Sequence, residues 1–217
     1  MQNPAYIEKP LYPESDDTPM AETDIHAKLM INLWFALENF FRNDPQVYVS
    51  RNLFLYYVKG DPRKVVAPDV FFVRGVPKGD RRVYYLWEER VAPQVVIEIS
   101  SQHTFKEDVF KKFHTYEKLG VCEYFIFDPT SDYIKDSPLI GFRLQDREYV
   151  EMELENDRLR SDELGLDLVI VENMLRLFDP GAGKFLMTPD EEAEARIRAE
   201  AEVERLRAEI ELLKQKP

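Results

Sequence analysis

Two short apolar segments, each carrying a single carboxylate, constrain the fold of this chain more than any other feature. The first runs from Val66 to Val73 and contains Asp69; the second runs from Gln94 to Ser100 and contains Glu98, 29 positions further on. Both have the length and β-branched content of buried strands. An ionised carboxylate is seldom buried without a partner, and two carboxylates can share a divalent cation. The pattern predicts two strands that bring their acids to one metal site.

A helix is predicted directly after the second strand, over Thr104–Leu119, where apolar residues recur every three or four positions. Within it, Asp108, Lys112 and Tyr116 follow one another at intervals of four, which places them on one helix face. Another apolar strand is predicted at Glu123–Pro129. The strand–helix–strand order is typical of a βαβ unit, in which the helix packs beside its own strand.

Such packing directs Lys112 toward Asp69 and Glu98, and phosphodiester hydrolysis uses this combination of groups. Carboxylates hold Mg²⁺ or Mn²⁺, which lowers the pKa of a bound water and neutralises phosphate charge. A lysine orients the nucleophile or stabilises the transition state. The residues therefore predict a metal-dependent hydrolase of phosphodiesters with Asp69, Glu98 and Lys112 as catalytic residues. We expect Asp108 to be an exposed partner of Lys112, and Tyr116 to pack in the core with its hydroxyl hydrogen-bonded.

Three segments together resemble the PD-(D/E)XK nuclease superfamily: Pro68-Asp69, Glu98-Ile99-Ser100 and the helix that carries Lys112. More narrowly, they resemble a branch of restriction-endonuclease-like nucleases formerly described as a domain of unknown function. The resemblance covers roughly residues 18–185, including Pro19–His26 and Gly120–Pro129. It implies an α/β fold with a restriction-endonuclease-like mixed central sheet flanked by helices, and acids at the ends of adjacent strands.

The resemblance also implies a set of metal ligands. Asp69 and Glu98 would bind Mg²⁺ or Mn²⁺, with the carbonyl oxygen of Ile99 as a third ligand. Some members of the superfamily add a glutamate or histidine from the first helix, which makes Glu22 and His26 candidate ligands; a pair on the helix surface is the alternative. A histidine ligand would shift the preference from Mg²⁺ toward Mn²⁺.

Two departures from the superfamily pattern keep a second hypothesis open. The superfamily lysine stands two residues after the glutamate, where this chain has Ser100, so Lys112 would enter the site from the helix. Gln94 occupies the position four before Glu98, where this branch often has an acid. The formal net charge of −12 also works against tight binding to nucleic acid. The alternative is a catalytically inactive nucleic-acid or protein interaction module on the same fold.

Composition indicates the compartment and the partners. The 217 residues contain one cysteine, Cys122, which we expect to be buried and inert, and contain no apolar run long enough to cross a membrane. The N-terminus lacks a signal-peptide pattern. We expect a soluble, cytoplasmic protein whose partner is nucleic acid, with DNA as the expected substrate, and no membrane.

The chain is predicted to divide into a nuclease domain with an N-terminal arm, residues 1–187, and a charged helix, residues 188–217. That last segment has four apolar residues spaced 3, 4 and 3 apart, namely Val203, Leu206, Ile210 and Leu213. The spacing matches about two heptads of a coiled coil, and a homodimer formed through it would suit double-strand cleavage. A solvated single helix and an oligomeric scaffold organised by this helix are the alternatives.

The remaining elements are predicted from periodicity and turn residues. A buried helix is expected over residues 24–42, capped by Thr23. Strands are expected at Val47–Val58, Val83–Trp87, and around 139–154 and 166–178.

Overall fold

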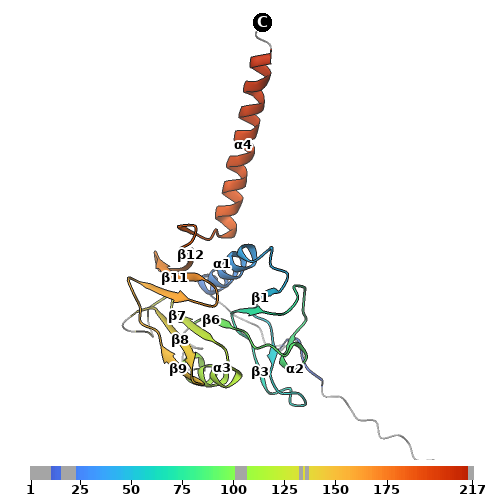
Figure 1. The fold of residues 1–217 in the computed structure, drawn as a ribbon, viewed down its shortest axis with the longest axis vertical. Helices are drawn as coiled ribbons and strands as arrows, with labels where there is room; N and C mark the ends of the chain where they lie inside the picture. The colour runs from blue at the N-terminus through green and yellow to red at the C-terminus, as the bar shows by residue number, and fades with distance from the viewer. Residues whose placement is uncertain (1–10, 16–22, 101–106, 132–133, 135–136, 215–217) are drawn as a thin grey trace, which may run out of the picture.

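The computed structural model describes residues 11–15, 23–100, 107–131, 134 and 137–214 (Figure 1). Its centre is a six-stranded mixed sheet. In spatial order the strands are β1 (Val47–Arg51), β4 (Val70–Arg74), β6 (Val95–Ile99), β7 (Glu123–Phe127), β8 (Leu139–Gln145) and β9 (Glu148–Glu151). Within this sheet β6 and β7 pair in parallel, and the other neighbours pair antiparallel.

Two smaller sheets and four helices complete the described part of the chain. One sheet contains β10 (Arg158–Ser161), β11 (Leu166–Val171), β12 (Met174–Asp179) and β13 (Lys184–Phe185). The other contains β3 (Val65–Val66), β2 (Leu55–Tyr56) and β5 (Tyr84–Tyr85). The helices are α1 (Asp24–Phe40), α2 (Leu86–Glu89), α3 (Phe113–Leu119) and α4 (Pro189–Lys214), and a π-helical segment η1 (Glu107–Lys112) leads directly into α3.

Both faces of the central sheet are buried, which explains why β4 and β6 read as continuous apolar segments. In β4, Val70 and Phe72 face α1 and the sheet of β10–β12, whereas Phe71 and Val73 face the opposite side, against residues of α3. In β6 the same alternation places Val96 on the α3 side. Glu98 follows Val96 by two residues, so its side chain also points toward α3.

Helix α1 forms as its sequence predicts. The hydroxyl of Thr23 accepts the backbone N–H of His26 at 3.3 Å, which satisfies one of the free donors at the helix start. Leu29, Leu33 and Leu37 are buried on one face and pack against the central sheet. The cap fixes where α1 begins and therefore where His26 lies.

The predicted strand Val47–Val58 is wrong as a single element, because β1 ends at Arg51 and β2 joins a different sheet. Asn52 adopts a φ of 45°, in the left-handed region that asparagine tolerates better than most residues. Its N–H donates to the carbonyls of Pro68 and Asp69. The predicted strand Val83–Trp87 is reduced to Tyr84–Tyr85, since α2 begins at Leu86.

The predicted helix Thr104–Leu119 is only partly within the described residues and is not uniformly α-helical. Glu107–Lys112 is π-helical, and the α-helical part begins at Phe113. Gly120, with a φ of 79°, ends the helix as a left-handed cap. The strand–helix–strand prediction is confirmed, because β6 and β7 pair in parallel around this helix.

Helix α4 begins at Pro189 and extends away from the rest of the molecule (Figure 1). The division of the chain between residues 187 and 188 remains a prediction. No helix within the described part of the chain is long and apolar enough to cross a membrane.

Candidate functional site

The antiparallel pairing of β4 with β6 brings Asp69 and Glu98 together. Val70 lies opposite Ile97, so Asp69, one residue before β4, reaches the end of β6. The Asp69 carboxylate accepts the N–H of Ile99 at 2.7 Å, and the Glu98 carboxylate lies 3.3 Å from the N–H of Asp69. Each acid thus receives a backbone hydrogen bond from the other acid's strand.

Lys112 and Tyr116 both reach Glu98 from the helix that follows its strand. The Lys112 Nζ atom lies 2.9 Å from Glu98 Oε2, and the Tyr116 hydroxyl donates to Glu98 Oε1 at 2.7 Å. The Glu98 side chain is 0% exposed and that of Lys112 is 15% exposed. Burial, followed by the charge of Glu98, raises the pKa of Tyr116 well above its ordinary value, so the hydroxyl remains a donor.

His26 contacts the second carboxylate. Its Nε2 atom lies 3.1 Å from Asp69 Oδ2, with the two side chains 12% and 14% exposed. Burial by itself would raise the pKa of Asp69. The hydrogen bond and charge of His26, the charge of Lys112 and the N–H of Ile99 outweigh burial, so the pKa of Asp69 lies below its ordinary value. Asp69 is therefore ionised at neutral pH.

Ser100 stands at the position of the superfamily lysine, two residues after Glu98. Its backbone N–H donates to Phe127 and continues the β6–β7 ladder, but its Oγ atom has no hydrogen-bond partner among the residues described. An unsatisfied buried hydroxyl costs about 1–3 kcal/mol. Such an atom two residues from Glu98 is suited to contact a water or ligand that enters beside the carboxylates.

The chemistry of these donors fits a divalent cation. Two carboxylates supply the hard oxygen ligands that Mg²⁺ and Mn²⁺ prefer, and an adjacent imidazole is compatible with Mn²⁺. Among the described residues, no group of three His, Cys, Asp or Glu side chains could hold a metal ion in the present arrangement. Lys112 and His26 instead accompany the two carboxylates. Ligation by Ile99 remains a prediction.

Two other candidate residues of the sequence analysis are Glu22 and Asp108. Glu22 lies outside the described residues, and for Asp108 the structure describes the backbone alone.

The π-helical segment η1 alters the expected geometry of the helix. The four-residue spacing of an α-helix does not apply from Asp108 to Lys112. Lys112 and Tyr116, four residues apart at the junction with α3, do reach the same carboxylate. π-Helical turns within helices are frequent at functional sites.

The structure gives local roles to the other residues of interest. Gln94 accepts the N–H of Arg74 at 2.6 Å, so it supports the backbone beside β4. His103 lies outside the described residues, and His114 is exposed on the surface of α3. Cys122 is half-buried instead of fully buried; burial and the neighbouring Glu163 raise the pKa of its thiol to about 11, which makes it unreactive at neutral pH.

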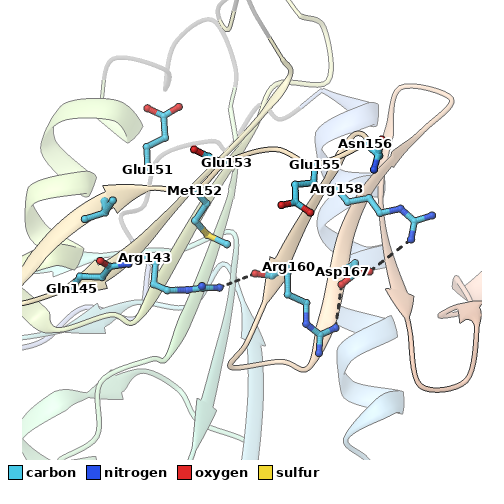
Figure 2. A pocket seen from close by; sticks show the side chains of 11 residues that line it. Arg143, Gln145, Glu151, Met152, Glu153, Glu155, Asn156, Arg158, Arg160 and Asp167 are labelled. Carbon is cyan, nitrogen blue, oxygen red and sulfur yellow. Dashed lines mark hydrogen bonds and ion pairs between the residues drawn. The ribbon is translucent and has the colours of Figure 1, made fainter.

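A hollow of about 670 Å³ lies elsewhere, where β8 and β9 meet β10 and β11 (Figure 2). Three arginines line it, and all three are paired: Arg143 with Glu123 and Asp162, and both Arg158 and Arg160 with Asp167. None of the residues gathered around Glu98 lines this hollow. Because these ion pairs neutralise its arginines, the hollow is poorly suited to binding a phosphate.

Comparison with known families identifies the chain's relatives. A family model described as "Uma2: Putative restriction endonuclease" matches residues 17–171. The chain belongs to this family. The matched range contains the whole cluster of His26, Asp69, Glu98, Lys112 and Tyr116, and it ends before α4. Membership in the Uma2 family agrees with the predicted restriction-endonuclease-like mixed sheet flanked by helices.

One solved structure similar to the chain is that of "a putative nuclease belonging to DUF820" from Anabaena variabilis ATCC 29413. The two share 16% sequence identity with a TM-score of 0.48, over 67% of this chain and 76% of that one. No curated protein matches the chain.

Proposed function

We propose that the chain is a metal-dependent endonuclease that hydrolyses phosphodiester bonds of nucleic acid, with DNA as the substrate. The observation that carries the proposal is the Asp69–Glu98 pair, in which Glu98 is fully buried, Asp69 is 14% exposed, and the Lys112 ammonium lies 2.9 Å from Glu98. Two carboxylates and one ammonium, gathered at adjacent strand ends, are costly to bury and are hard to explain as fold stabilisation alone. Membership in a family described as restriction endonucleases supports the same activity.

Asp69 and Glu98 would hold the cation, Mg²⁺ or Mn²⁺. When bound, the ion would supply positive charge beside the scissile phosphate and lower the pKa of a coordinated water. Asp69 is suited to this role because its pKa lies below the ordinary value, which keeps it ionised. The Tyr116 hydroxyl holds one Glu98 oxygen, so the side chain keeps a single orientation.

Lys112 would act on the phosphate. Its ammonium already lies beside the two carboxylates, so a phosphate oxygen brought to them would come within its reach. A positive charge fixed there stabilises the negative charge that develops on the transferring phosphoryl group. Ser100, buried with a free hydroxyl among the described residues, would hydrogen-bond a water or phosphate oxygen in the place of the superfamily lysine.

His26 would orient Asp69 or join it as a ligand. Its imidazole contacts the same Asp69 oxygen that accepts the Ile99 N–H. As a ligand it would favour Mn²⁺ over Mg²⁺. Ile99, through its carbonyl, and Glu22 complete the proposed set of ligands.

The test is cleavage of plasmid and single-stranded DNA in Mg²⁺, Mn²⁺ or EDTA. Asp69→Asn, Glu98→Gln and Lys112→Ala should each lower the rate at least roughly a hundredfold, because even residues that only support metal ligands typically cost ten- to hundredfold. Lys118→Ala, an exposed lysine on the same helix, should cleave like the wild type. Cutting that survives Glu98→Gln would contradict the proposed site.

A second candidate function is an inactive nucleic-acid or protein interaction module on the same fold. Ser100 in place of the superfamily lysine and the internal pairing of both carboxylates favour it. Calorimetric titration with Mn²⁺ separates the two. A nuclease should bind the ion and lose that binding in Glu98→Gln, whereas the module should neither bind the ion nor cut DNA.

A further inference from the structure

Helix α4 leaves the domain as an isolated element with a fixed base. None of its 26 residues is buried. At its start, Arg176 pairs with both carboxylate oxygens of Glu191 at 3.0 and 2.8 Å, and Asn39 donates to Glu192 at 2.7 Å. These contacts with β12 and α1 set the direction in which the helix projects (Figure 1).

The far half of α4 carries an apolar stripe that nothing in the described chain covers. Val203, Leu206, Ile210 and Leu213 are between 44% and 60% exposed. Their spacing places all four along one line of the helix, as in the a and d positions of a coiled coil. No element of the described chain buries these four side chains, and a second helix packed along the stripe would do so.

We propose that α4 pairs with α4 of a second copy of this chain as a parallel, in-register, two-stranded coiled coil. The residue types support this arrangement. The a positions hold the β-branched Val203 and Ile210, and the d positions hold Leu206 and Leu213. Branching at a combined with leucine at d favours two parallel strands over trimers or tetramers.

The charges beside the stripe select the parallel orientation. The g positions hold Glu202 and Glu209, and the e positions hold Arg207 and Lys214. In a parallel pair each g residue meets the e residue five positions later on the other helix, so Glu202 meets Arg207 and Glu209 meets Lys214. In an antiparallel pair g would face g and e would face e, which would place like charges together.

Two of these residues, Glu202 and Lys214, have partners within the single chain that are easily exchanged. Glu202 pairs with Arg205, and Lys214 pairs with Glu211, all at exposed positions of the same helix. Ion pairs between exposed side chains contribute little to stability, so contacts across the dimer can replace them at little cost.

This proposal does not rest on the proposed nuclease activity, because no residue of α4 belongs to the cluster around Glu98. It does have a consequence for that activity. A parallel pair holds both domains at the same end of the coil, which would present two candidate sites to one duplex.

The first test is sedimentation equilibrium of the full chain over a roughly hundredfold range of concentration, which should reveal a reversible dimer. Ile210→Glu should raise the dissociation constant at least about a hundredfold, since it places a charge in the apolar seam. The control is Ile197→Glu, the same change in the same helix at a residue 61% exposed but off the seam. A wild type that remains monomeric, or equal effects of the two variants, would overturn the proposal.

The second test is of orientation. Leu212 and Leu213 are neighbours, 64% and 60% exposed, but only Leu213 lies in the seam. Under oxidation, Leu213→Cys should form a disulfide-linked dimer several-fold faster than Leu212→Cys, with the wild type reporting any contribution of Cys122. If instead Leu213→Cys linked faster to Val203→Cys than to itself, the helices would be antiparallel and the proposal wrong. Circular dichroism confirms that each variant keeps its helix.

Discussion

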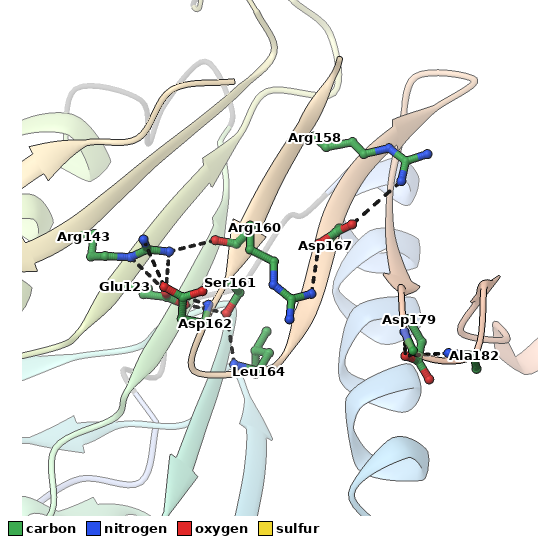
Figure 3. Close-up of polar contacts among 11 residues, drawn as sticks. Glu123, Arg143, Arg158, Arg160, Ser161, Asp162, Leu164, Asp167, Asp179 and Ala182 are labelled. Atoms are coloured by element: carbon green, nitrogen blue, oxygen red, sulfur yellow. Dashed lines mark hydrogen bonds and ion pairs between the residues drawn. The ribbon is translucent and has the colours of Figure 1, made fainter. Parts of the chain in front are cut away.

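Glu98 and Glu123 lie on the neighbouring strands β6 and β7, both completely or almost completely buried, yet their surroundings differ in kind. Glu123 accepts from the Arg143 guanidinium, the Ser161 hydroxyl and the Asp162 N–H (Figure 3). Glu98 accepts from a lysine, a tyrosine and a backbone N–H, and has a second carboxylate beside it. The two strands are parallel, and Val95 at the start of β6 pairs with Glu123. Glu123 therefore lies at the start of β7, whereas Glu98 lies near the end of β6.

The difference shows that burial of a charge does not by itself identify a site. The donors to Glu123 come from β8 and from the end of β10, and Arg143 also donates to the carbonyl of Arg160, so this cluster joins the two sheets. A planar guanidinium forms such fixed contacts. Glu98 pairs instead with a single ammonium on a flexible stem. The first arrangement is suited to stability, and the second is the one for which we propose a role in chemistry.

The largest expected effect is on the free energy of unfolding of Lys112→Met. Removing the ammonium leaves Glu98 buried without its counter-charge, which should cost about 3–5 kcal/mol. Adding Glu98→Gln should recover most of that loss, because the uncompensated charge is then gone. Denaturant unfolding of the two single variants and the double variant measures the coupling. Strictly additive losses would contradict the pairing of Lys112 with Glu98.

Glu123→Gln tests the other half of the comparison. It should destabilise the fold by about 2–3 kcal/mol, because Arg143, Ser161 and the Asp162 N–H lose a charged acceptor while Arg143 remains partly accessible to water. Cleavage per folded molecule should be unchanged. If this variant lost activity without losing stability, the division of roles between the two glutamates would be wrong.

Tyr116→Phe should cost about 1.5–3 kcal/mol, the usual contribution of a hydrogen bond to a charged group. Tyr149→Phe is the matched control: its hydroxyl donates to the neutral carbonyl of Val121 at 3.0 Å, and its loss should cost about 1 kcal/mol. Thermal or denaturant unfolding distinguishes the two values. Equal losses would indicate that Glu98 is not charged in the folded protein.

The smallest effect concerns Cys122, which precedes Glu123 in the chain. With its pKa raised to about 11 by burial and by Glu163, the thiol should react with iodoacetamide at neutral pH at least roughly a hundredfold more slowly than a free cysteine. The rate should rise as the pH approaches the pKa, because the thiolate is the reactive form. A fast reaction at neutral pH would show that this end of the sheet is open to solvent.

Much of the candidate site could be predicted because its residues violate local rules. A carboxylate within Val-Val-Ile-Glu-Ile or after Ala-Pro requires a partner, and this requirement, together with Lys112 on the following helix, points to Glu98 and Asp69. Caps are equally local: Thr23 begins α1, and Gly120 ends α3. Strand β10 is not predicted, because Arg158-Leu159-Arg160-Ser161 contains one apolar residue and forms a strand only by pairing with β11.

By itself the sequence determined the strand ends that carry acids, the helix that carries Lys112, the heptad spacing of α4 and the family. Only the tertiary structure decided how these are joined. The register of β4 on β6 places the Asp69 carboxylate on the Ile99 N–H, and the segment that leads into α3 is π-helical up to Lys112. The tertiary structure also decided that Glu123, in an equally apolar strand, pairs with an arginine, whereas Glu98 pairs with a lysine. Patterns along a chain report local preference, whereas the partner of a buried charge depends on contacts between residues distant in sequence.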